Sequence, residues 1–178
     1  EAGTSLHRAH ALRRLGHEVE VLDPWSFLPK SDLSHRIICK LVYEGAAAAL
    51  DGYIRRLLFL SIQGRFYDVA WVDQGELLGP KTIERLKDVA AKVVNYNVDD
   101  PFPADDPVKK RFTLYRKATP AYDLMVVVRA ENIDEAYAAG ARMVLHVHRS
   151  ADEVAHAPLP LTTEDRSRWE SDVSFIGT

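Results

Sequence analysis

The chain has little cysteine and no long apolar run. Its 178 residues include a single cysteine, Cys39, which cannot form an internal disulfide. Such a chain fits a reducing compartment, so we expect the protein to be cytoplasmic. No apolar stretch approaches the roughly 18 residues that a membrane span requires, and the first residues lack the basic and then apolar order of a secretory signal. The sequence therefore predicts no membrane span and indicates no targeting.

The chain also lacks the short motifs that most often indicate an enzyme class. It contains neither the glycine patterns of dinucleotide-binding and P-loop proteins nor the HExxH and GxSxG motifs of metalloproteases and hydrolases. These absences argue against the four classes. A glycine motif after a first strand would escape notice if that strand were absent from the sequence.

No charge of one sign dominates the composition. The chain has 23 Lys and Arg against 26 Asp and Glu, a formal net charge of -3. This total gives no general attraction to phosphate backbones or anionic lipid, so nucleic acid is not a predicted partner. With 47% apolar and 28% charged residues, the chain has the composition and length of an ordinary globular domain with one core.

From residue 67 onward, short β-branched runs alternate with helical segments. The runs cover residues 68–72, 92–96, 123–128 and 142–146. Proline-led helices start after Gly79 and at residues 106–107, and a helix over 131–139 ends at Gly140. Strands separated by helices of this length pair in parallel through right-handed crossovers. We therefore predict an α/β fold with a doubly wound, mainly parallel, Rossmann-like sheet.

The residues before 67 predict more helices and one strand. A helix capped by Thr4 or Ser5 precedes residues 18–22, which alternate polar and apolar side chains as a strand near a sheet edge does. Residues 32–63 predict two consecutive helices. Residues 3–5 look like the end of a loop after a first, central strand, which the sequence does not contain. Because the chain also has no initiator methionine, we expect upstream residues to be missing from it.

The C-terminal residues have a different pattern. Residues 157–161 predict an extended linker, and Thr162 or its neighbour can cap a helical turn. Residues 172–176 alternate as a new strand and lead into a glycine. We therefore expect residues 1–157 to form one Rossmann-like domain and residues 158–178 to form a linker and the first strand of a second domain.

Several segments together resemble one glycosyltransferase family. Residues 3–19 are similar to the opening of GT-B glycosyltransferases, and residues 67–76, 96–102 and 171–178 resemble the CgeB-like spore-maturation members of that type. The order and spacing of the four segments fit this family. The similarity extends over nearly the whole chain.

This resemblance implies an enzyme with two Rossmann-like domains that face one another. The first holds mainly the acceptor and the second mainly a nucleotide-sugar donor, and no other cofactor is implied. The chain would be the first, acceptor-side domain, with the donor-binding domain beyond it. The resemblance thus implies a sugar transferase whose acceptor is unknown and no turnover by this chain alone.

Polar side chains follow each predicted strand from 67 onward. In an open α/β sheet, ligands bind at the carboxyl ends of the strands, where carboxylates and imidazoles suit the proton transfer and charge stabilisation of glycosyl transfer. We assign catalysis to Asp99, Asp100 and His146. We assign acceptor binding to a second set, namely Thr4, Asp73, Gln74, Glu76, Asn97 and Arg129.

Simpler interpretations remain open for these carboxylates. Asp99 and Asp100 precede a proline and fit an ordinary turn. Residues 73–76 fit a glycine turn with solvated side chains. Asp105 and Asp106 are best explained as helix caps.

The histidines do not predict a metal site. His146 and His148 lie two residues apart and would share a strand face, and His156 could join them around zinc. No cysteine or suitably spaced further ligand completes such a set. We therefore predict no metal and keep a role in the cleft as the alternative for one of these histidines.

Two other functions compete with sugar transfer. A binding or assembly module could keep half of a GT-B fold without activity. A dehydrogenase or epimerase half would bind NAD(P) instead.

Overall fold

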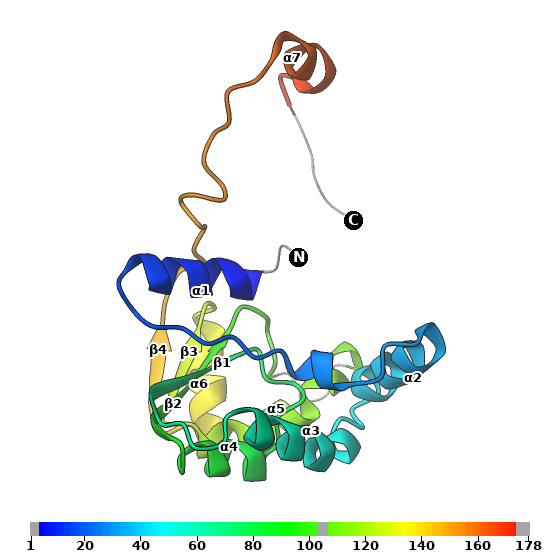
Figure 1. Cartoon of the computed structure of the whole chain (residues 1–178), viewed down its shortest axis with the longest axis vertical. Coiled ribbons are helices and arrows are strands. Elements are labelled where there is room, and N and C mark those ends of the chain that lie inside the picture. Colours follow the sequence, from blue (N-terminus) through cyan, green and yellow to red (C-terminus); the bar gives the residue numbers. More distant parts are fainter. Residues whose placement is uncertain (1–3, 103–106, 174–178) are drawn as a thin grey trace. The chain divides into compact units, whose positions relative to one another are not determined.

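The computed structural model describes residues 4–102 and 107–173 and shows a parallel sheet with helices packed on it (Figure 1). The chain divides into two compact units. The larger consists of residues 19–149, and the smaller combines the residues before 19 with those after 149.

The larger unit is built on four parallel strands in the order β1-β2-β3-β4 (Figure 1). They are β1 (Tyr67–Asp73), β2 (Ala90–Asn97), β3 (Leu124–Val127) and β4 (Val144–His146). The predicted α/β fold with a parallel sheet is confirmed. A sequential order of this kind is one half of a doubly wound, Rossmann-like arrangement. The fourth strand is shorter than the predicted range of 142–146.

The register brings the carboxyl ends of the strands to one edge. Asp73 of β1 pairs with Tyr96 of β2, and one residue further along Asn97 pairs with Val127 of β3, which in turn pairs with His146 of β4. The polar residues that follow the strands therefore lie along one edge of the sheet, which we call the carboxyl edge.

Short helices connect successive strands. Because every crossover moves one strand further in the same direction, right-handed connections place these helices on one face of the sheet. The helices are α4 (Pro80–Leu86) after β1; η2 (Pro107–Phe112), α5 (Thr113–Ala118) and η3 (Thr119–Ala121) after β2; and α6 (Glu131–Ala138) after β3. Pro80 stands in the first turn of α4, where its missing N–H costs no hydrogen bond.

The stretch from 32 to 63 forms two helices, as predicted. They are α2 (Asp32–Tyr43) and α3 (Ala48–Ser61), preceded by the short helix η1 (Pro24–Phe27). Gly45 separates α2 from α3 with φ of 83°, and a Cβ on it would come within 3.0 Å of the Lys110 carbonyl oxygen. This close approach explains why the break falls at Gly45, whereas Gly52 lies inside α3.

The prediction of a strand over residues 18–22 is wrong. The segment forms no ladder with any strand among the described residues. Side chains hold it instead, because the Tyr67 hydroxyl donates to Glu20 Oε2 at 2.6 Å and Arg65 pairs with the same carboxylate. Alternating polarity shows that a segment has one drier face, but a strand also needs a neighbour to receive its backbone hydrogen bonds.

One hydrophobic core lies between the sheet and these helices. Helix α3 and the residue that follows it contribute Ile54, Leu58 and Ile62 to this core, all at most 6% exposed. Each fully buried side chain of this size stabilises the fold by about 1.5–3 kcal/mol. Other core members from the strands and connecting helices are Ile83, Val93, Phe112, Tyr115, Tyr122 and Met125.

The smaller unit contains two helices, α1 (Thr4–Arg14) and α7 (Thr163–Trp169). Asp152 accepts hydrogen bonds from the Val154 and Ala155 N–H groups at 2.9 and 3.0 Å and pairs with Arg14 of α1 at 3.1 Å. Thr162 caps α7, as predicted, and Asp165 completes a capping box with it. The strand predicted over 172–176 lies largely outside the described residues, as do Asp105 and Asp106. None of the described helices is long and apolar enough to span a bilayer.

Candidate functional site

A strained turn follows β1 at the carboxyl edge. Gln74 has φ of 61° and Gly75 has φ of 101°, both in the left-handed region. The Asn95 side-chain amide donates to the carbonyl oxygens of Gln74 at 2.8 Å and Val72 at 3.2 Å. A Cβ on Gly75 would lie 3.1 Å from the hydroxyl of Tyr122. Buried side chains therefore hold the turn in place, and the turn fixes the position of the next residue, Glu76.

Buried tyrosines support this turn. The Tyr115 hydroxyl donates to Asn95 Oδ1 at 2.9 Å, and both residues are fully buried. Burial raises the pKa of Tyr115 and of Tyr122, so both hydroxyls stay protonated at neutral pH. None of these three residues was predicted from the sequence. The available signal was the polar Asn95 within an apolar strand, since a buried amide needs partners.

Three carboxylates come together where β1 and β2 end. Glu76 is half-buried, and burial is the main cause that raises its pKa. Arg111 opposes this effect, whereas the negative charges of Asp99 and Asp73 add to it. The charges of Asp73 and Asp99 therefore both act on Glu76, as expected if the strand ends meet at one edge. We call Asp73, Glu76 and Asp99 the acidic cluster.

Arg111 is the counter-charge of the acidic cluster. Its Nη2 donates to Asp99 Oδ2 at 3.0 Å, and its guanidinium carbon lies 4.5 Å from the centre of the Phe112 ring. The Asp99 N–H donates to Asn97 Oδ1 at 2.9 Å. Asp99 is thus fixed by both its side chain and its backbone. Arg111 carries no local sequence signal, because its partner lies 12 residues away.

Asp100 belongs to a second group, around the start of α6. The Asn132 side-chain amide donates to Asp100 Oδ1 at 2.8 Å and to Glu135 Oε2 at 2.7 Å. Asn132 is 1% exposed, and its Oδ1 atom accepts no hydrogen bond from the described residues.

Arg129 and His146 stand at the carboxyl ends of β3 and β4, further along the sheet from the acidic cluster. His146 is exposed at the end of β4, and Val127 of β3 separates it from Asn97 in the register, which corresponds to about 10 Å across two strand spacings. The rings of His146 and His148 contact each other at a centroid distance of 5.8 Å. Arg129 is exposed after β3. Thr4 begins α1 in the other compact unit, so its assignment stays a prediction.

No known protein family, curated protein or solved structure matches this chain. A half-buried carboxyl group with a raised pKa can accept a proton from a hydroxyl once it is ionised. Among the described residues, no group of His, Cys, Asp and Glu has the arrangement of a metal site.

Proposed function

We propose that this chain is the acceptor-side domain of a GT-B glycosyltransferase. The observation that carries the proposal is the acidic cluster of Asp73, Glu76 and Asp99 at the carboxyl edge of a parallel, Rossmann-like sheet. Ligands of such sheets bind outside this edge. The ordered similarity of four segments to the CgeB-like enzymes supports the same function.

Glu76 fits the role of proton acceptor better than Asp99 or Asp100. Arg111 already engages Asp99, and Asn132 already engages Asp100. Glu76 is half-buried and burial raises its pKa, so its ionised form is a stronger base than an ordinary glutamate. Glu76 would take the proton of the acceptor hydroxyl as the acceptor oxygen bonds to the sugar and the nucleotide departs with the electron pair. The donor would be held by a second domain facing this edge.

The test uses the complete gene product that carries this chain, with a panel of sugar nucleotides. Glu76→Gln should lower kcat by about 100-fold or more, because general base catalysis contributes roughly 100- to 10,000-fold. Since the pKa of Glu76 is raised above 4.5, wild-type activity should increase with pH on the acid side as this group loses its proton. The variant should lack this dependence.

The matched control is Glu84→Gln, the same change at an exposed position on α4. It should leave kcat within about twofold, since exposed substitutions away from special features change little. A complete protein that neither hydrolyses nor transfers any sugar nucleotide would overturn the proposal. Equal losses in both variants would remove Glu76 from the mechanism.

A non-catalytic binding module is the second candidate. It is favoured by the bonded state of Asp99 and Asp100, because Arg111 and Asn132 hold these two carboxylates in fixed orientations. This alternative predicts that the chain binds a glycan at the carboxyl edge, detected by chemical-shift changes at Asn97 and Glu76. It also predicts that the complete protein does not turn over.

A further inference from the structure

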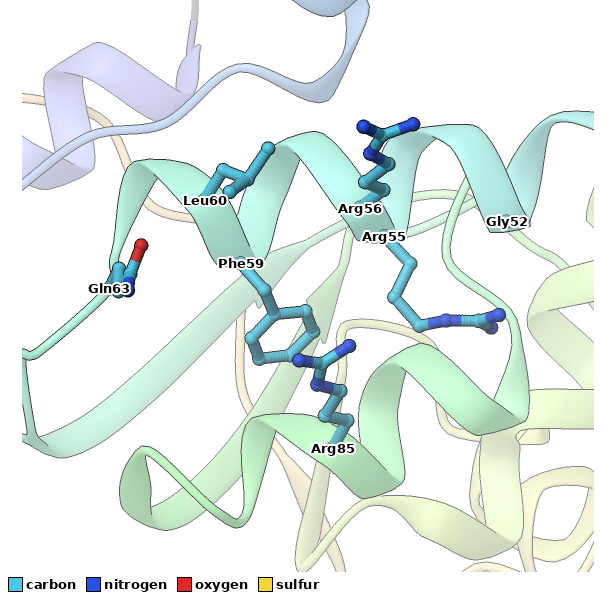
Figure 2. A pocket seen from close by; sticks show the side chains of 7 residues that line it. All are labelled: Gly52, Arg55, Arg56, Phe59, Leu60, Gln63 and Arg85. Atoms are coloured by element: carbon cyan, nitrogen blue, oxygen red, sulfur yellow. The ribbon is translucent and has the colours of Figure 1, made fainter.

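A hollow of about 500 Å³ lies between α3 and α4, on the helical side of the larger unit. Figure 2 shows the side chains around it. Its volume lies within the range of about 300–1,000 Å³ that is common for small-molecule sites. Its lining residues are Gly52, Arg55, Arg56, Phe59, Leu60, Gln63 and Arg85.

The hollow has a net positive charge. Arg55 pairs with Asp51 at 2.9 Å, but Asp51 also accepts hydrogen bonds from the Gly79 N–H at 2.7 Å and the Thr82 hydroxyl at 2.6 Å. Its carboxylate is therefore fully engaged where α4 begins. Within the described part of the chain, neither Arg56 nor Arg85 pairs with a carboxylate. Two guanidinium groups thus remain available to an anion.

Arg85 is held in position by an aromatic ring. Its guanidinium carbon lies 4.4 Å from the centre of the Phe59 ring, and Figure 2 shows the two side chains reaching toward each other from α4 and α3. A guanidinium stacked on a ring keeps its N–H edge available for hydrogen bonds. Arg56 leaves α3 on another side and lies at the rim of the hollow (Figure 2).

The hollow is separate from the acidic cluster. α4 begins near the carboxyl end of β1 and runs back toward the start of β2. Arg85 stands in its last turn, and Gln63 follows the end of α3 just before β1 starts. Both residues therefore lie toward the amino ends of the strands, opposite the edge where Glu76 lies.

We propose that this hollow binds a small molecule that carries phosphate groups. Arginine presents a planar array of donors that matches phosphate oxygens, and two such groups at one hollow suit a ligand with adjacent phosphates. Gln63 adds an uncharged donor. The ligand binds independently of sugar transfer at the carboxyl edge, so the proposal stands or fails apart from the proposed function.

Calorimetric titration of the chain with inorganic pyrophosphate tests the proposal at fixed ionic strength. We expect saturable binding by the wild type and about tenfold weaker binding by Arg85→Gln, because one charge-assisted hydrogen bond has roughly this effect on affinity. The double change Arg56→Gln with Arg85→Gln should abolish measurable binding. Arg85→Lys keeps the charge but not the planar donors, and it should fall between the wild type and Arg85→Gln.

The matched control is Arg142→Gln, which removes the same charge from an exposed position after α6. It should leave binding unchanged. Equal weakening by Arg142→Gln would show general charge attraction and overturn the proposal, as would an absence of saturable binding. Arg56 and Arg85 are exposed, so the variants should keep the wild-type thermal unfolding midpoint, which the same samples check. Tighter binding of inorganic phosphate than of pyrophosphate would contradict the proposal that the ligand carries adjacent phosphates.

Discussion

At the scale of single residues, Gly75 shows how backbone geometry sets the site. Its φ of 101° is strained for any other residue, and a Cβ there would lie 3.0 Å from Val72 Cγ1 and 3.1 Å from the Tyr122 hydroxyl. Gly75→Ala should therefore lower the free energy of unfolding by about 2–4 kcal/mol, measured by urea denaturation. Gly64→Ala is the control, because Gly64 has φ of 76° but a Cβ on it would meet nothing within 4 Å. Gly64→Ala should lower the free energy of unfolding by only about 1 kcal/mol. An equal decrease in both variants would mean that packing around Gly75 is unimportant.

The site residues that were predictable from the sequence differ from the others in one physical respect. Asp73, Glu76 and Asp99 were predictable because each closely follows a strand, and parallel pairing gathers strand ends. Arg111 and Tyr115 were not, because they act through partners 12 and 20 residues away on other elements. The sequence shows that a side chain is polar, but it does not show which distant residue hydrogen-bonds to it and holds it in place.

At the scale of elements, Asp152 joins α1 to the turn after residue 150. Hydrogen bonds from the Ala155 and Val154 N–H groups, and then the charge of Arg14, lower the pKa of Asp152 to about 2. A carboxyl group with a lowered pKa stabilises the folded state above its unfolded value of 3.8, and this contribution is lost as the pH falls toward 2. Hydrogen exchange should therefore show the Val154 and Ala155 amides losing protection between about pH 4 and 2.

Asp152→Asn should remove that acid transition and leave the two amides less protected at neutral pH. Asp165→Asn is the control, since Asp165 caps α7 through Thr162 and should affect only that helix. Protection that persisted at pH 2 in the wild type would show that other contacts hold the turn.

Segments that are held by side-chain contacts are hard to predict from the sequence. The four strands followed from the sequence pattern, whereas residues 18–22 alternate like a strand but form no strand.

At the scale of the whole molecule, the larger unit has two chemically opposite regions. The acidic cluster lies at the carboxyl edge of the sheet, and the basic hollow lies between α3 and α4 toward the amino ends. The parallel topology was predictable and locates the first region. The second depends on how two helices pack against each other, which a prediction of two helices over residues 32–63 does not include.

We therefore expect the two regions to bind their ligands without coupling. Asp51 links them, because it holds Arg55 beside the hollow and the start of α4 after the strained turn. The proposed phosphate contacts come from Arg56 and Arg85, however, and coupling requires a ligand to favour one of two states of a shared element. Pyrophosphate affinity should thus be the same in the wild type and in Glu76→Gln, within about twofold. A larger difference would show that the turn after β1 transmits binding through Asp51, and Asp51→Asn should then abolish the difference.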